Sequence, residues 1–159
     1  MKQSIKAIFS FGVVSGVITT IGLITGLVQS GAERPTVIGG ILTIAFADAF
    51  ADALGMHYSS KKQDGGSNYW NSTLATFFVK LIVSSTFLIP MIIAPIRIGL
   101  IISVIWSLIL LSVLSYYVAI YENEKPWTSI LKHVSISIAV IFITFYIGNV
   151  INNRLNLRG

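Results

Sequence analysis

Apolar and polar residues alternate along this chain in long blocks. Five mostly apolar runs cover residues 5–28, 36–58, 74–94, 98–121 and 128–151. Each is long enough for a membrane-spanning helix, which needs about 20 such residues. The connections "QSGAERP", "SSKKQDGGSNYWNS", "PIR" and "ENEKP" are short and hold the polar and turn residues. The pattern predicts an all-α integral membrane protein, with residues 1–159 forming a single transmembrane domain of five helices.

Composition supports a multi-pass membrane protein. Hydrophobic residues make up 54% of the chain and charged residues 11%, and the mean hydropathy is +0.81. The absence of cysteine excludes disulfides, thiolate metal sites and cysteine nucleophiles. The formal net charge is +5, but the basic residues stand singly at the ends of apolar runs. This distribution indicates contact with a lipid bilayer and no nucleic-acid partner.

The first apolar run raises the alternative of a cleaved signal peptide. Lys2 and Lys6 precede it, and the "SGA" at 30–32 resembles a cleavage site. The run is about twice as long as the apolar region of a signal peptide. A retained spanning helix is therefore expected.

The positions of Lys and Arg predict the orientation in the membrane. The residues on one side are Lys2, Lys6, Lys61, Lys62, Lys80, Lys125 and Lys132, and those on the other side are Arg34, Arg97, Arg154 and Arg158. The positive-inside rule then places the N-terminus in the cytoplasm and the C-terminus outside it. The host membrane stays open between a microbial cell membrane and an organellar membrane.

The first helix carries small and hydroxyl residues on one face. Gly12 and Gly16, like Gly22 and Gly26, are four residues apart. Such residues allow close approach of helices in lipid. The alternative is that this face, with Ser15 and Thr19, lines a permeation path.

Asp48 and Asp52 lie inside the second apolar run, in "AFADAFADALGM". On insertion scales each mid-membrane Asp costs about 2.5 to 3.5 kcal/mol, while each large apolar residue offsets about 0.3 to 0.6 kcal/mol. The acids outweigh the apolar residues of this helix. Neighbouring helices, water, a bound cation or protonation must therefore stabilise them.

Asp48, Asp52 and Met56 recur every four residues, which places them on one stripe of a helix. Two like charges one turn apart repel, so a proton and a metal cation are expected to compete for the site. Carboxylates with a thioether suit an ion of intermediate softness, such as Fe²⁺ or Mn²⁺. We predict these three residues as metal ligands in a cation/proton exchanger. His57 projects about 100° away from Met56 on a helix and is left out of the ligand set.

A structural interpretation competes with metal binding. Lys80 lies about two turns inside the third apolar run, which is itself unusual. It could pair with an Asp of the second helix and neutralise it. In that case the acid would contribute to helix packing.

The motifs resemble the vacuolar iron transporter family. "SGVITTIGLITGL" resembles the family's N-D-G-[IL]-[VI]-[ST]-T opening, and "FADAFADALGMHYSS" resembles its L-A-D-G-x-S-M-x-x-G-E-Y-x-S stretch. Weaker similarity continues in "STFLIPMIIAP" and in "KPWTSILKHVSISIAVIFITFYIGNVI". The resemblance covers essentially the whole chain.

Several key positions depart from the family pattern. The family's first-helix Asp falls on Ser15, its second-helix Met on Asp52, and its Glu on Met56, so only Asp48 is unchanged. The family's Glu-rich cytoplasmic insertion is also absent. These departures leave open whether the site has been relocated along the stripe or transport activity has been lost.

The resemblance implies a homodimer that exports Fe²⁺ or Mn²⁺ from the cytosol in exchange for protons. It implies no cofactor; the metal is the substrate. Enzyme function is not expected, since "DAFAD" lacks the D-x-x-D-G-x-x-A-R part of CDP-alcohol phosphotransferases and the Gly-Asp context of intramembrane aspartyl proteases. The main alternative is a non-transporting membrane adaptor whose acidic stripe binds a basic partner helix.

Overall fold

The computed structural model describes residues 2–63, 69–122 and 125–156, and all regular structure in these ranges is helical. The helices are α1 (Lys2–Gln29), α2 (Arg34–Gln63), α3 (Tyr69–Thr86), α4 (Leu88–Ile93), α5 (Ile96–Glu122) and α6 (Pro126–Asn156). Five stretches are long and apolar enough to cross a membrane: Ser10–Gln29, Arg34–Ser59, Trp70–Ile93, Ile96–Ile120 and Pro126–Arg154. The predicted all-α fold, with five helical stretches long and apolar enough to span a membrane, is confirmed. Most helices extend a few residues past the apolar runs, because polar residues continue the last turns.

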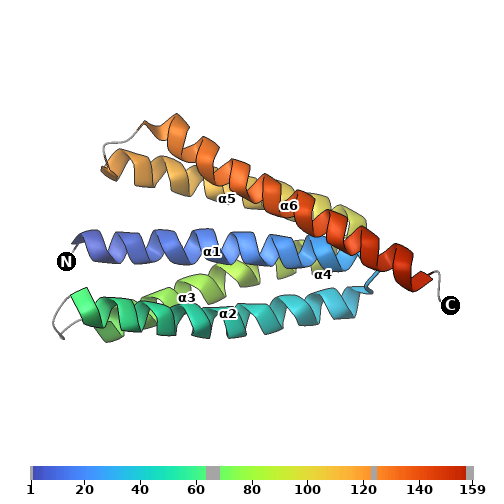
Figure 1. Cartoon of the computed structure of the whole chain (residues 1–159), viewed down its shortest axis with the longest axis horizontal. Helices are drawn as coiled ribbons and strands as arrows, with labels where there is room; N and C mark the ends of the chain where they lie inside the picture. The colour runs from blue at the N-terminus through green and yellow to red at the C-terminus, as the bar shows by residue number, and fades with distance from the viewer. Residues whose placement is uncertain (1, 64–68, 123–124, 157–159) are drawn as a thin grey trace.

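Helix α1 lies in the middle of the bundle. It packs against α2 and α3 on one side and against α5 and α6 on the other (Figure 1). The start of α1, the end of α2 and the start of α6 lie at one end of the bundle, and the end of α6 lies at the other (Figure 1). The two ends of the chain are thus on opposite sides, as five crossings require.

The hydrophobic core is centred on α1. Val13, Val17, Ile21 and Ile24 are buried at successive turns of α1, the spacing expected for a helix surrounded by others. By contrast, α6 is buried over only 11% of its spanning window. Its large side chains, such as Phe142, point outward. In a bilayer this outer face is solvated by lipid.

The glycines of α1 allow neighbouring helices to come close. A Cβ added at Gly12 would lie 3.2 Å from Val79 Cγ1 of α3, and one added at Gly22 would lie 3.1 Å from Val140 Cγ1 of α6. The pair Gly12 and Gly16 thus allows close approach of α3, and the pair Gly22 and Gly26 allows close approach of α6. This supports the packing interpretation of these glycines.

The third predicted span, 74–94, is divided into α3 and α4. Pro90 cannot donate to the carbonyl of Thr86, and its ring crowds that carbonyl, so α3 ends at Thr86. The Phe87 backbone N–H instead donates to the carbonyl of Ser84, at 3.2 Å, in the tighter pattern of a 3₁₀ turn. Helix α4 ends before Pro95 with an extended Ala94.

Candidate functional site

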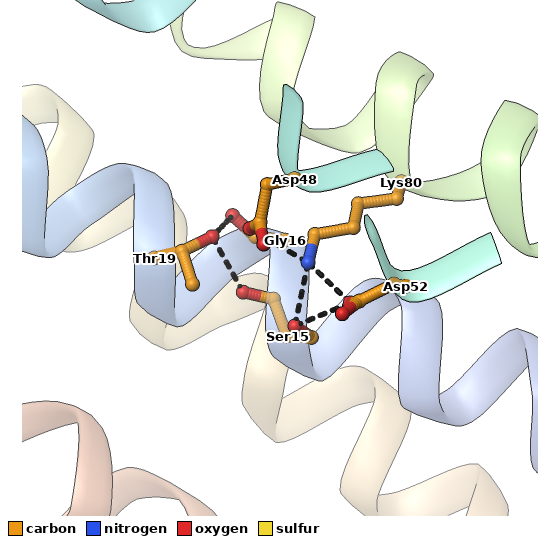
Figure 2. Close-up of polar contacts among 6 residues, drawn as sticks. All are labelled: Ser15, Gly16, Thr19, Asp48, Asp52 and Lys80. Atoms are coloured by element: carbon orange, nitrogen blue, oxygen red, sulfur yellow. Dashed lines mark hydrogen bonds and ion pairs between the residues drawn. The ribbon is translucent and has the colours of Figure 1, made fainter. Parts of the chain in front are cut away.

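Asp48 and Asp52 lie on the side of α2 that faces α1 and α3 (Figure 2). Their side chains are 23% and 19% exposed, respectively. The neighbouring stripe of Ala45, Ala49 and Ala53 is buried. These small residues let α2 pack closely, so both carboxylates are held in the helix interface rather than in the outer, lipid-facing surface.

Lys80 of α3 reaches between the two acids. Its Nζ lies 2.6 Å from Asp48 Oδ2 and also forms an ion pair with Asp52 Oδ2 (Figure 2). Lys80 is completely buried. A buried ammonium group is tolerated only when it is paired and hydrogen-bonded. The pairing of Lys80 considered from the sequence is therefore present, and it involves both acids rather than one.

Ser15 of α1 completes the cluster. Its hydroxyl accepts a hydrogen bond from Lys80 Nζ at 2.7 Å and donates one to Asp52 Oδ2 at 2.8 Å. The cluster of Ser15, Asp48, Asp52 and Lys80, called the ion cluster below, thus joins α1, α2 and α3 (Figure 2).

Gly16 explains how a lysine side chain fits beside α1. A Cβ added at Gly16 would lie 3.3 Å from Lys80 Cγ and 3.3 Å from Ser84 Oγ. Because Gly16 has no side chain, there is room for the aliphatic part of the Lys80 side chain to cross α1. A larger residue would displace the stem and with it the ammonium group.

The two acids are not equivalent. Asp52 Oδ2 accepts hydrogen bonds from both Ser15 and Lys80. Asp48 Oδ2 is buried and close to the ammonium, but among the described residues it has no hydrogen-bond donor of acceptable geometry. Asp48 is therefore held mainly by its ion pair with Lys80, whereas Asp52 also accepts a hydrogen bond from Ser15.

The charges in the ion cluster do not balance. Two ionised carboxylates and one ammonium group leave a net charge of −1. A net charge inside a bundle with a low dielectric constant is costly. With these formal charges the cluster is expected to attract a further cation.

The other predicted site residues are placed differently. Met56 is half-buried and lies one turn beyond Asp52 along α2. The Thr19 hydroxyl lies near the cluster but donates to its own helix, to the Ser15 carbonyl at 2.8 Å. His57 contacts α3, with Nδ1 3.2 Å from Thr73 Oγ1 and its ring 5.0 Å from that of Trp70. His57 thus packs against the first turns of α3.

Within residues 2–63, 69–122 and 125–156, no three His, Cys, Asp or Glu side chains gather into a group that could hold a metal ion. The ion cluster therefore offers two carboxylates, an amine and a hydroxyl. Sequence reasoning treated Lys80 as a competitor of metal binding. It did not anticipate that the lysine occupies the space between both acids, although a lysine deep in an apolar helix was the available signal.

A scan against protein-family models finds no match, and a search of curated proteins finds no significant similarity. The resemblance to vacuolar iron transporters thus rests on the motifs quoted above.

Proposed function

We propose that this chain is a multi-pass membrane transporter that exchanges a divalent cation for protons at the ion cluster. The observation that carries the proposal is the buried Lys80 ammonium between two partly exposed carboxylates. Three titratable groups in contact can share a proton and a metal ion among them. Ionisable groups inside a transmembrane bundle are characteristic of ion and proton pathways.

Charge balance gives the exchange its stoichiometry. A net charge is costly inside a helical bundle, so the cluster is expected to keep the same net charge before and after a divalent cation binds. Two protons must then leave for each ion.

The ligands that the ion cluster offers are the two Asp carboxylates and the Ser15 hydroxyl. Such oxygen ligands bind divalent cations, Mn²⁺ among them. The family resemblance suggests Fe²⁺ or Mn²⁺ as the transported ion. The resemblance further supports export from the cytosol and a homodimer.

The adaptor alternative has less support from the geometry. It requires the acidic stripe to bind a basic residue of a partner helix. Lys80 of the same chain already fills that role, with Nζ 2.6 Å from Asp48 Oδ2. A basic partner would have to displace a fully buried lysine.

The test is metal flux in liposomes that contain the purified protein. Mn²⁺ uptake driven by an imposed pH gradient is followed with a metal-sensitive dye, for the wild type, Asp48→Asn and Asp52→Asn. Loss of flux in both variants, with normal flux in Glu33→Gln, supports the proposal; Glu33 is an exposed acid outside the cluster. Normal flux in correctly folded Asp48→Asn and Asp52→Asn proteins would show that the cluster only stabilises helix packing.

A further inference from the structure

A second polar site lies on the other side of α1 from the ion cluster. It is a pocket of about 400 Å³ between α1, α5 and α6. Its lining residues belong to the first half of α1, the end of α5 and the start of α6, and these helix segments lie toward the same end of the bundle (Figure 1). Its volume is within the range of small-molecule binding sites, about 300–1,000 Å³.

One part of the pocket is basic and rich in hydroxyl groups. Lys132 and His133 of α6 line it together with Ser115 and Ser129. The Ser115 hydroxyl lies 2.9 Å from His133 Nδ1, which fixes the ring and leaves Nε2 as its second polar atom. Both serines are buried, at 1% and 6% exposure. Among the described residues that line the pocket, none is acidic.

The rest of the pocket is apolar. Phe11 and Val14 of α1 face Leu114 and Val118 of α5 across it. A ligand that fits must therefore combine an anionic, hydrogen-bond-accepting group with an apolar part. Free inorganic phosphate would leave the apolar wall without a partner.

The depth of the pocket matches the lipid headgroups. Helix α6 has 31 residues and is about 46 Å long, close to the full thickness of a bilayer with its headgroups, about 40–45 Å. Lys132 follows the first residue of α6 by six positions, or about 9 Å. This places it near the boundary between headgroups and acyl chains, which begins about 5–8 Å below the surface.

We infer that this pocket binds the phosphate-bearing headgroup of an anionic phospholipid, with its glycerol and upper acyl carbons against the apolar wall. Lys132 supplies the positive charge. The hydrogen-bonded Ser115–His133 pair supplies one donor, and the buried Ser129 hydroxyl supplies a second. Basic pockets between transmembrane helices recognise anionic headgroups in this way. The site is independent of the ion cluster and of the proposed transport activity.

The experiment is a lipid titration of the delipidated full chain in non-ionic detergent, followed by native mass spectrometry. Dioleoyl phosphatidylglycerol is compared with dioleoyl phosphatidylcholine and with inorganic phosphate. We expect the wild type to retain phosphatidylglycerol in preference to phosphatidylcholine. Lys132→Gln is expected to weaken this binding about fivefold or more, since one lysine near a lipid surface contributes about 1 kcal/mol.

Three further variants show whether the site is specific. Val118→Trp fills the apolar wall and is expected to weaken binding while all charges are kept. Lys132→Arg is expected to retain binding. Lys125→Gln removes an exposed lysine at the same end of the bundle but outside the pocket, and is expected to have no effect.

Several results would overturn the assignment. Equal retention of the two lipids, or equal weakening by Lys125→Gln and Lys132→Gln, would reduce it to a general attraction between the basic helix end and anionic lipid. Unchanged binding of phosphatidylglycerol in both Lys132→Gln and Val118→Trp would show that the lipid does not bind in this pocket. Displacement of phosphatidylglycerol by millimolar inorganic phosphate would reassign the pocket to a water-soluble phosphate compound.

Discussion

Lys80 Nζ lies 2.6 Å from Asp48 Oδ2, with the lysine fully buried and the aspartate 23% exposed. The same ammonium group also contacts Asp52, so one positive charge is shared by two negatively charged carboxylates. This arrangement explains how α2 carries two acids within a membrane. It also leaves one negative charge, which is the physical reason to expect an exchangeable cation.

Removal of the lysine is expected to destabilise the bundle. Lys80→Met leaves two adjacent carboxylates without their cation, and breaking a buried ion pair costs about 3–5 kcal/mol. The midpoint of thermal unfolding in detergent should fall clearly. Adding Asp48→Asn to Lys80→Met removes one of the two repelling charges, and the double variant should be more stable than Lys80→Met alone. A double variant that is less stable would contradict the role of charge pairing.

Ser15 is expected to matter for cation affinity. Its hydroxyl bonds both Lys80 and Asp52, and a hydrogen bond to a charged group contributes about 1.5–3 kcal/mol. Ser15→Ala should raise the Mn²⁺ concentration for half-maximal flux about tenfold or more. Ser85→Ala is the matched control, because Ser85 donates only to the Leu81 carbonyl of its own helix, at 2.7 Å, among the bonds described. Equal effects of the two substitutions would count against a role of Ser15 in the site.

Gly16 is expected to tolerate no large side chain. Gly16→Ile would push on Lys80 Cγ and Ser84 Oγ, which lie 3.3 Å from the position of a new Cβ. Overpacking of this kind costs about 1–3 kcal/mol and moves the ammonium. Metal flux should fall sharply. Gly39→Ile, where a new Cβ meets nothing within 4 Å, should keep most of the flux, and a similar loss in both variants would contradict this account.

The orientation predicted from Lys and Arg can be measured directly. The chain has no cysteine, so single-cysteine variants report only the introduced site. A membrane-impermeant maleimide added to intact cells should label Glu33→Cys and not Lys125→Cys, since these exposed residues stand at opposite ends of the bundle. Labelling is expected to reverse in inverted vesicles. The opposite pattern would place the N-terminus outside the cytoplasm.

The helices were predictable because their signal is distributed over many residues. Apolar runs of membrane-spanning length set the number of helices, and the short polar connections set where one helix ends and the next begins. The break between α3 and α4 was harder to foresee. Pro90 stands near the end of an apolar run, where the hydropathy stays high and gives no sign of a break. The helix is interrupted there because Pro90 has no backbone N–H to donate to the preceding turn.

The site was predictable only in part. The four-residue spacing placed Asp48 and Asp52 on one stripe, and the structure brings Ser15 to them. Whether Lys80 meets one acid, both or neither depends on how α3 rotates and where Gly16 leaves space. Such pairings between helices are tertiary, and no periodicity within one helix encodes them.

The most direct test of the central claim is the number of protons released per Mn²⁺ bound by the purified protein in weakly buffered detergent solution. An unchanged net charge of the ion cluster before and after binding requires two protons per ion. The account predicts a value near two for the wild type, and loss of saturable Mn²⁺ binding in Asp48→Asn and Asp52→Asn. Saturable Mn²⁺ binding without proton release, or with full affinity in both variants, would contradict it.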